Sequence, residues 1–426
     1  MLDLKLLRQD PKEIEKKLQT KDPSVKLDEL LKLDEQTRHL QTTVEELKAK
    51  QNHASKEIGK RKAQKQDVSD IMSEMASIKE QIEKLHHELE EVEKKRDLLL
   101  LELPNIPFDE IKISLDPKDN VCIKTHKEKP TFSFPFKNHM ELGESLKLFD
   151  FNKSAKSTGS GWPLYTNHGA MLEWALINYM LDIHIKNGFY MVMPPLLVRP
   201  DILTGSGQLP KFADQQYKIE DKDYELYLIP TAEVILNGLN YDEIIPADNL
   251  PLYYVAYTPC FRREAGAAGK QERGLIRTHQ FNKVELFSVC DPDKSNQAFD
   301  KLLSSAEEVL QGLDMHYRNM LLVTGDTSFA SAKTVDIEVW LPGQDRYYEV
   351  SSVSNCTDFQ ARRSKTRAKK GSDKPYLVHT LNGSGLATSR LMVALLENFQ
   401  QPDGSVKIPT ILQKYLPVEQ LTLQPA

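Results

Sequence analysis

The sequence contains no long hydrophobic run, which argues against a membrane-spanning helix. No stretch approaches about 18 uncharged apolar residues, and the longest candidate, MVMPPLLV, has strand length and two prolines. The first ten residues, MLDLKLLRQD, place charges where a secretory signal needs an apolar core. We therefore expect a cytoplasmic protein.

Cysteine is scarce as well. The chain has four cysteines among 426 residues, and no two of them have the spacing of zinc ligands. In an intracellular chain such thiols stay reduced, so we interpret them as small buried or incidental side chains. The usual phosphate-binding loops are also missing, because there is no GxxxxGK[ST] and no GxGxxG after a strand.

Neither sign of charge dominates. Lysine and arginine total 56 and aspartate and glutamate total 62, a net charge of −6. This balance argues against a protein whose whole surface binds nucleic acid, but it allows a local basic patch. The length suggests two or three domains, and 40% apolar residues are enough for a sizeable core.

The first hundred residues carry two heptad seams, in which seam positions are separated alternately by three and four residues. The first seam is Leu30, Leu33, Thr37, Leu40, Val44, Leu47, Gln51, Ala54, Ile58 and Arg61. The second is Val68, Ile71, Met75, Ile78, Ile82, Leu85, Leu89, Val92, Arg96 and Leu99. The connection between them is short, so the pattern predicts an antiparallel two-helix arm that ends at Pro104.

Basic residues cluster where the predicted arm turns back. They are Lys56, Lys60, Arg61, Lys62 and Lys65. One interpretation is ordinary: basic residues favour a helix C-terminus and keep a surface soluble. The other is a tip that contacts the phosphates of an elongated nucleic acid. The arm alone does not decide between them.

The remainder of the chain predicts an α+β body. Strand-like runs such as LYYVAYTPCF, FNKVELFSV and TVDIEVWL mix with helical stretches near residues 168–187, 293–315 and 386–399. Strands and helices do not alternate regularly, which favours an antiparallel sheet flanked by helices over a doubly wound fold. We expect the arm at 1–105, a connector at 106–135 and the body at 136–426.

Charged residues interrupt otherwise apolar strands in residues 258–287. In a continuous strand, Arg262 and Glu264 would share one face, as would Phe281, Lys283 and Glu285 on the returning strand. Charges inside a sheet are costly unless they meet a ligand or one another, so a structural ion pair between the strands is the alternative. Gly383 and Gly385 precede the predicted helix that carries Arg390, and glycines there would let the backbone approach a ligand.

These segments resemble the class II aminoacyl-tRNA synthetases. NGFYMVMPPLLVRP resembles motif 1 of that class, residues 258–287 resemble motif 2, and LNGSGLATSRLMVALLEN resembles motif 3. The strings PTAEV, FRREAG, GLIRTHQFNKVE, EVSS, SNCTDFQARR and LNGSG are similar to those of the bacterial-type seryl-tRNA synthetases. The resemblance covers essentially the whole chain, and the hairpin resembles that family's tRNA-binding arm.

The resemblance implies a two-step reaction. Serine's carboxylate attacks the α-phosphate of ATP, and the terminal 3′-hydroxyl of the tRNA then accepts the seryl group. Arg262 and Arg390 are implied as catalytic cations, and Glu349 and Ser352 as ligands of Mg²⁺. An alternative for Glu349 is an ion pair with an arginine of the body.

The implied binding residues fall into two sets. Serine would be bound by Thr231, Ala232, Glu233, Arg262, Glu285, Asn382 and Ser384. ATP would be bound by Arg262, Arg263, Glu264, Arg277, Thr278, Phe281, Glu349, Val350, Ser351, Ser352 and Arg390.

The implied partners are serine tRNA, held by the basic tip, and a second copy of the chain, met through Pro194 or Pro195 of motif 1. A simple edge strand is the alternative for those prolines. Selenocysteine tRNA is a further substrate that the resemblance suggests. Three other functions stay open: a ligase that loads a carrier protein, a synthetase for another amino acid, and a non-catalytic coiled-coil protein.

Overall fold

The computed structural model describes residues 1–265 and 274–422. Residues 266–273, which fall within the motif 2 segment, lie outside the described residues. The chain divides into two compact units. One comprises residues 2–19 and 23–103, and the other comprises residue 1, residues 20–22 and residues 104–426.

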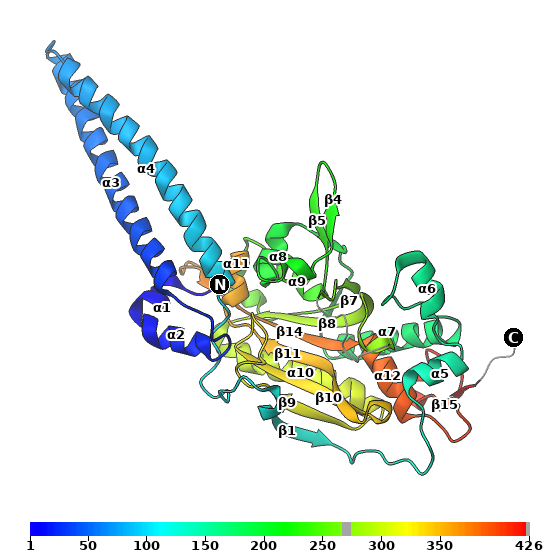
Figure 1. Ribbon diagram of the computed structural model, residues 1–426. Coiled ribbons are helices and arrows are strands. Elements are labelled where there is room, and N and C mark those ends of the chain that lie inside the picture. The colour runs from blue at the N-terminus through cyan, green and yellow to red at the C-terminus, as the bar shows by residue number, and fades with distance from the viewer. Residues whose placement is uncertain (266–273, 423–426) are drawn as a thin grey trace. The chain divides into compact units, whose positions relative to one another are not determined.

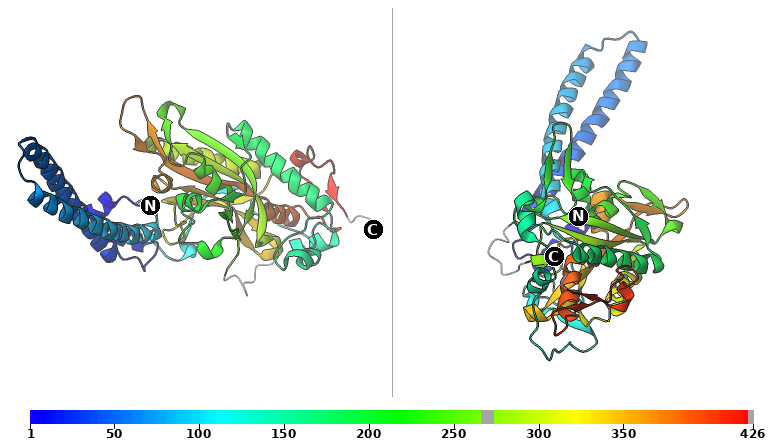
Figure 2. Two further views of the ribbon diagram at one scale, coloured as in Figure 1. Left: turned by 90° about the horizontal axis from the view of Figure 1, so that it is seen from above. Right: turned by 90° about the vertical axis from the view of Figure 1, so that its right-hand side faces the viewer.

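The N-terminal unit is a helical hairpin. Two short helices, α1 (Leu4–Gln9) and α2 (Pro11–Gln19), precede the long helices α3 (Asp28–Ala63) and α4 (Ser69–Glu102). The long helices run side by side in Figure 1 and in both views of Figure 2. Hydrogen bonds between Gln41 and Glu93 (2.9 Å) and between Arg61 and Asp70 (3.1 Å) fix them as antiparallel. The predicted two-helix arm is confirmed.

The predicted seam residues form the contact between the two long helices. Leu40, Leu89 and Val92 make a buried cluster, against which Leu33 and Leu85 pack. Near the base, buried Asp34 accepts hydrogen bonds from the Arg8 guanidinium at 2.6 and 2.7 Å. This ion pair joins α1 to α3, so the hairpin is stabilised by its seam and by the small helices at its base.

The larger unit is built on one sheet. Among the described residues, eight strands form it in the order β1-β9-β10-β11-β14-β8-β7-β2, and only the β2–β7 pair is parallel. Figure 1 shows β1 at one edge. The strands are β1 (Val121–His126), β2 (Tyr190–Val192), β7 (Leu252–Phe261), β8 (Gln280–Cys290), β9 (Tyr317–Leu321), β10 (Lys333–Leu341), β11 (Arg346–Asn355) and β14 (His379–Ala387).

One face of the sheet is covered by helices α7 (His168–Lys186), α10 (Ser295–Gly312) and α12 (Thr388–Asn398). Their apolar residues form one core with Val284 and Leu286 of β8. Successive side chains of a strand point to opposite faces, so Phe281, Lys283 and Glu285 point to the other face. That face carries the candidate site.

The smaller elements surround this sheet. The helices are α5 (His139–Ser145), α6 (Phe151–Thr158), α8 (Pro200–Ser206), α9 (Ala232–Gly238) and α11 (Phe359–Ser364). The strands are β3 (Leu197–Val198), β4 (Lys218–Glu220), β5 (Glu225–Leu228), β6 (Ile244–Pro246), β12 (Arg367–Lys369), β13 (Tyr376–Leu377), β15 (Val406–Lys407) and β16 (Gln420–Leu421).

Two local features add to the sequence interpretation. Gly383 and Gly385 precede α12 as expected, and they lie in β14, in the middle of the sheet. A Cβ on Gly385 would lie 2.4 Å from the His184 ring, so close packing against α7 accounts for this glycine. Within residues 106–135, β1 pairs with β9 and so belongs to the sheet. The domain boundaries themselves stay a prediction.

Among the described residues, no helix combines the length and apolar character needed to cross a membrane.

Candidate active site

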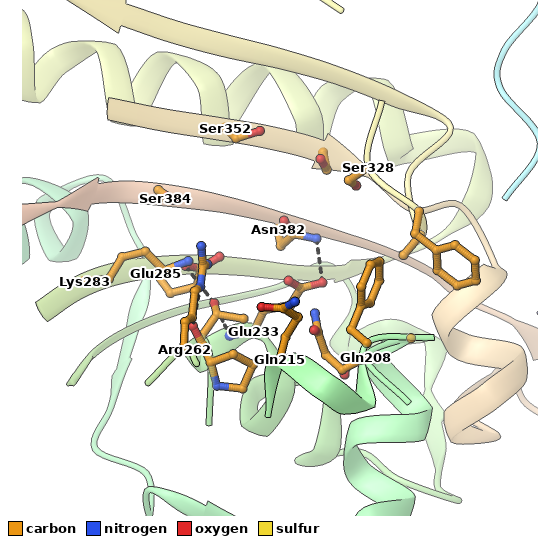
Figure 3. Close-up of a pocket in the computed structure, with 18 of the residues that line it drawn as sticks. Gln208, Gln215, Glu233, Arg262, Lys283, Glu285, Ser328, Ser352, Asn382 and Ser384 are labelled. Atoms are coloured by element: carbon orange, nitrogen blue, oxygen red, sulfur yellow. Dashed lines mark hydrogen bonds and ion pairs between the residues drawn. The ribbon is translucent and has the colours of Figure 1, made fainter. Parts of the chain in front are cut away.

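Two adjoining pockets open on the other face of the sheet, opposite α7, α10 and α12, within the described residues. The first has a volume of about 480 Å³ and the second of about 210 Å³. Both are lined by Arg262, Glu264, Lys283, Glu349 and Ser384, so they form one continuous site. Figure 3 shows the first pocket, with Arg262 and Lys283 toward one end and Gln208 toward the other.

A β-bulge explains how Glu349 and Ser352 reach the same pocket. Residues three apart in a regular strand point to opposite faces. In β11, however, the pairing with β10 is irregular. The adjacent β10 residues Ile337 and Glu338 pair with Ser351 and Glu349, which are two residues apart. Val350 is the extra residue, and an extra residue re-aims the side chains beyond it.

The carboxylate of Glu233 belongs to the wall of the first pocket. Glu233 Oε1 accepts hydrogen bonds from the side-chain amides of Gln360 at 2.6 Å and Asn382 at 2.9 Å. Gln360 is itself held by Thr380, whose hydroxyl donates to its side-chain oxygen at 2.7 Å. Burial, and then the neighbouring charge of Glu285, raise the pKa of Glu233 to about 7.

A second carboxylate, Glu285, is almost completely buried beside it. Glu285 forms an ion pair with Lys283, two residues earlier on the same strand, and accepts a hydrogen bond from the Thr231 hydroxyl at 3.3 Å. The alternative considered from the sequence was an ion pair between β7 and β8. The observed ion pair instead joins two residues of β8, Lys283 and Glu285. The two carboxylates make a small polar cavity suited to an ammonium and a hydroxyl group.

Three arginines supply positive charge around the second pocket. Arg277 pairs with Glu264 at 2.7 Å, and Arg390 donates to the Glu349 carboxylate at 3.2 Å and to its main-chain oxygen at 2.8 Å. The guanidinium carbon of Arg262 lies 5.1 Å from the centre of the Phe281 ring. Cations, an aromatic ring and a narrow cavity together suit a nucleotide with a phosphate chain.

Arg262 and Glu264 do not share a strand face. Strand β7 ends at Phe261, and Glu264 adopts a positive φ of 48°. The turn in the chain directs Glu264 back toward Arg277, so the i, i+2 interpretation of this pair is wrong. Both side chains nevertheless line both pockets.

The residues around Glu349 fit a divalent cation. Asp336 lies directly opposite Ser352 in the β10–β11 register, and its Oδ1 atom is buried without a hydrogen-bond partner among the described residues. Burial, followed by the charge of Glu349, holds the pKa of Asp336 well above its usual range. Two carboxylates, one of them with an oxygen that has no partner among the described residues, form with the Ser352 hydroxyl an oxygen-rich donor set of the kind that Mg²⁺ prefers. The ion pair with a body arginine that was the alternative for Glu349 is present as well, because Arg390 pairs with its carboxylate at 3.2 Å.

The structure brings most of the predicted serine- and ATP-binding residues together. Arg262, Glu264, Glu349 and Ser384 line both pockets. Thr231, Glu233, Glu285, Ser352 and Asn382 line the first pocket, and Arg277, Thr278, Phe281, Val350 and Arg390 line the second.

Three predicted site residues line neither pocket. Ala232 is buried in a core cluster with Leu236 and Phe287. The Ser351 hydroxyl donates to the main-chain oxygen of Ser384 at 2.6 Å, so it supports the pocket from behind. Arg263 follows Arg262 after the end of β7, and its main-chain amide donates to the Gln215 main-chain oxygen at 3.1 Å.

The sequence interpretation assigned no role to Gln360 or Lys283. The sequence pattern could have indicated Lys283, because this residue lies between Phe281 and Glu285 on one strand face. Apart from the string SNCTDFQARR, no sequence pattern indicated Gln360, because its position against Glu233 depends on the packing of α11. The predicted tRNA-binding lysines lie on the other compact unit, at the turn between α3 and α4.

Comparisons with known proteins agree with this geometry. Residues 1–107 match the family model of the seryl-tRNA synthetase N-terminal domain, and residues 217–399 match that of the tRNA synthetase class II core domain (G, H, P, S and T). The serine–tRNA ligase of Chlamydia abortus is 51% identical over 99% of this chain and 100% of its own length. That of Chlamydia caviae is 52% identical, with 99% of each covered.

The chain belongs to the seryl-tRNA synthetase family.

Two solved structures of that family share the whole fold. Seryl-tRNA synthetase from Pyrococcus horikoshii, complexed with ATP, has a TM-score of 0.92 and 37% identity, with all of both chains covered. The cytoplasmic serine–tRNA ligase of Naegleria fowleri, in complex with AMP, has a TM-score of 0.87 and 28% identity over 100% of this chain and 99% of that one. The predicted α+β class II architecture and the predicted enzyme class, an aminoacyl-tRNA synthetase, are confirmed.

Proposed function

We propose that this member of the family activates serine with ATP in the two pockets and transfers the seryl group to serine tRNA. In the first step a carboxylate oxygen of serine bonds to the α-phosphorus, the bond to the β-phosphate oxygen breaks, and pyrophosphate leaves. In the second step the tRNA hydroxyl displaces AMP. The observation that supports this most is the continuity of the polar cavity around Glu233 and Glu285 with the three arginines.

In the serine site, Glu233 meets the substrate ammonium and Glu285 accepts a hydrogen bond from its hydroxyl. Thr231, Asn382 and Ser384 complete the wall, and Arg262 holds the carboxylate. Alanine would leave the buried Glu285 carboxylate without that donor, and such a loss can cost roughly 10⁴-fold in discrimination. Threonine adds a methyl group that a close-packed pocket rejects sterically.

In the ATP site, Arg262 bridges the serine carboxylate and the α-phosphate. Glu264 receives the adenine amino group, Phe281 stacks on the purine, and Thr278 lies beside it. Arg277 and Arg390 hold the phosphate tail. In the present structure each of these two arginines is paired with a carboxylate. ATP would take over those cations, so the ion pairs keep the charges compensated until the nucleotide arrives.

Glu349 and Ser352 would hold Mg²⁺, with Asp336 behind them. When bound, the ion would neutralise charge on the phosphates. The arginines position the phosphates. Arg262 holds the α-phosphate and Arg390 the tail of a bent ATP, so that two groups of like charge can meet in one orientation.

The basic tip of the hairpin would contact the tRNA backbone. Lys56, Lys60, Lys62 and Lys65 are exposed, whereas Arg61 is half-buried and pairs with Asp70 and Glu57. We assign tRNA binding to residues 1–105 and activation to the body at 136–426. A rod of this kind can recognise a long stem by shape and by backbone contacts.

Homodimerisation through motif 1 is part of the same proposal. Trp174 and Met171 of α7 and Tyr190 of β2 are large apolar residues with exposed side chains, and so is Met193, which follows β2. A group of exposed apolar side chains on adjoining elements suits a subunit interface. Serylation of selenocysteine tRNA and a cytoplasmic location stay predictions.

A pyrophosphate-exchange panel tests the proposed function. With each of the twenty amino acids in turn, serine alone should drive rapid ATP–pyrophosphate exchange, and bulk tRNA should then accept labelled serine. Exchange led by threonine would assign the chain to another substrate. Exchange with serine but no charging of tRNA would favour a carrier-protein ligase, the competing interpretation of the same body.

A buried glutamine should control the pH dependence of serine use. Replacing Gln360 with methionine removes a hydrogen bond that lowers the pKa of Glu233, so that pKa should rise from about 7. If ionised Glu233 binds the ammonium, kcat/KM for serine should rise with pH through an inflection near 7 in the wild type. In the variant that inflection should move to higher pH, as measured by exchange between pH 6 and 8.5. An unmoved inflection would remove Glu233 from ammonium binding.

A further inference from the structure

Strand β14 contains a β-bulge at Gly385. Ser384 pairs with Glu285 of β8 and lines both pockets. Leu386 pairs with Val284 and is buried in the core on the face covered by helices. Residues two apart in a regular strand would point to the same face. Here they pair with adjacent residues of β8, so Gly385 is the extra residue.

The bulge allows one strand to serve both pockets. Asn382 and Ser384 line the first pocket, and Ser384 and Ala387 line the second. In a regular strand Ser384 and Ala387, which are three residues apart, would point to opposite faces. The conformation at Gly385 therefore decides where Ser384 lies relative to Glu285, the carboxylate beside it on the neighbouring strand in Figure 3.

The imidazole of His184 holds the bulge from the face covered by helices. His184 belongs to α7 and is completely buried, and its Nε2 atom lies 2.9 Å from the main-chain oxygen of Gly385. A carbonyl oxygen only accepts hydrogen bonds, so Nε2 must carry the proton. The contact also requires glycine, because a Cβ at Gly385 would lie 2.4 Å from that nitrogen.

A second hydrogen bond fixes the orientation of this ring. When Nε2 of a neutral imidazole carries the proton, Nδ1 is an acceptor, so the Ser305 hydroxyl of α10, 2.8 Å away, donates to it. Ser305 in turn accepts from the Asn187 side-chain amide at 3.0 Å. Burial lowers the pKa of His184 to about 4, against the opposite effects of the Gly385 carbonyl and the Glu308 carboxylate. The ring is therefore neutral near pH 7 and has one tautomer.

We propose that His184 is a positioning residue for the selection of serine, because it holds the bulge at Gly385 and thereby keeps Ser384 against the cavity around Glu285. This inference rests on the proposed function. The preceding carbonyl, that of Ser384 itself, accepts from the Ser351 hydroxyl at 2.6 Å, so two side chains fix consecutive peptide groups. A displaced Ser384 would let water reach Glu285. A substrate without a hydroxyl would then be rejected less strongly, since the carboxylate would keep a partner.

The first test uses a ratio of rates, because a loss of folded protein lowers both rates equally. His184→Asn is neutral but too short to reach Gly385, whereas His184→Gln can place its amide nitrogen near the position of Nε2. In His184→Asn the ratio of serine-dependent to alanine-dependent pyrophosphate exchange should fall by about 10-fold, since misplacement by about 1 Å can cost about 10²-fold. In His184→Gln, which keeps the hydrogen bond, it should stay within about twofold of the wild type.

A second pair of variants tests the hydrogen bond that orients the ring. Ser305→Ala removes the donor to Nδ1 and should lower the same ratio by about fivefold, the equivalent of one ordinary hydrogen bond. Ser304→Ala is the matched control, because Ser304 is the preceding residue of α10, is exposed and donates to the Lys301 main-chain oxygen. It should leave the ratio unchanged. If His184→Asn fails to fold, this pair carries the test.

Nitrogen NMR measures the tautomer without chemistry. In protein labelled with ¹⁵N-histidine, the ring signals that disappear in His184→Gln should show a proton on Nε2 and none on Nδ1 at neutral pH. A proton on Nδ1, an unchanged ratio in His184→Asn and Ser305→Ala, or equal falls in His184→Asn and His184→Gln would overturn the inference. Absence of serine exchange in the wild type, or equal exchange with alanine, would instead refute the proposed function.

Discussion

Replacing Arg262 with alanine should lower the rate of serine-dependent pyrophosphate exchange by about 10²–10³-fold, the cost typical of losing one donor aimed at developing charge. Arg262 lines both pockets, and its guanidinium lies between the proposed serine site and Phe281. No other arginine lines both pockets within the described residues. Its loss should therefore reduce kcat more than it weakens the binding of ATP.

Two companion variants make this result specific. Arg262→Lys keeps the charge but loses the planar fork, so it should recover only part of the rate. Arg367→Ala is the matched control, because Arg367 is 39% exposed, pairs with Asp242 at 3.5 Å and lines neither pocket. Equal losses in Arg262→Ala and Arg367→Ala would show that exchange responds to stability and not to the charge at this position.

Removing the distal part of the hairpin should abolish tRNA charging while exchange continues. The side chains of Gln41 and Glu93 are hydrogen-bonded at 2.9 Å, so residues 42–92 can be replaced by a short glycine linker. This deletion retains the Arg8–Asp34 ion pair at the base. Charging should fall at least about 100-fold because backbone contacts dominate nucleic-acid affinity. Exchange should stay within about twofold, since both pockets lie in the other compact unit.

The tip lysines provide a finer version of the same experiment. Changing Lys56, Lys60, Lys62 and Lys65 to alanine should weaken tRNA binding and reduce its dependence on salt, by a slope of about one for each phosphate contact that is lost. Lys94→Ala with Lys95→Ala, two exposed lysines near the base of α4, should change neither. A collapse of exchange in a folded deletion variant would mean that the division between arm and body is wrong.

The sequence predicted the regular parts of the molecule well because their periodicity is local. Heptad seams specify the hairpin, and alternation along β8 specifies which face Phe281, Lys283 and Glu285 share. The Gln360–Glu233 contact could not be predicted in this way, because it joins residues 127 apart in the chain. Its geometry depends on where α11 packs.

Irregularities of the backbone could not be predicted from the sequence either. Glu349 and Ser352 were named as partners from resemblance, yet a regular strand would separate them, and only the bulge at Val350 brings them to one pocket. Glu264 reaches Arg277 because the chain turns after β7 with a positive φ. Ser351 was predicted to bind ATP together with Val350 and Ser352. Its hydroxyl instead donates to the main-chain oxygen of Ser384, and its side chain does not line either pocket.

The central claim is that the polar cavity around Glu233 and Glu285 selects serine and presents it to the arginines that hold ATP. The most direct measurement is pyrophosphate exchange by the wild-type protein with serine, alanine and threonine at equal concentrations. The account predicts fast exchange with serine and rates lower by about 10⁴-fold with alanine, which cannot donate to Glu285. Exchange with alanine at a rate close to that with serine, or no exchange with serine, would contradict it.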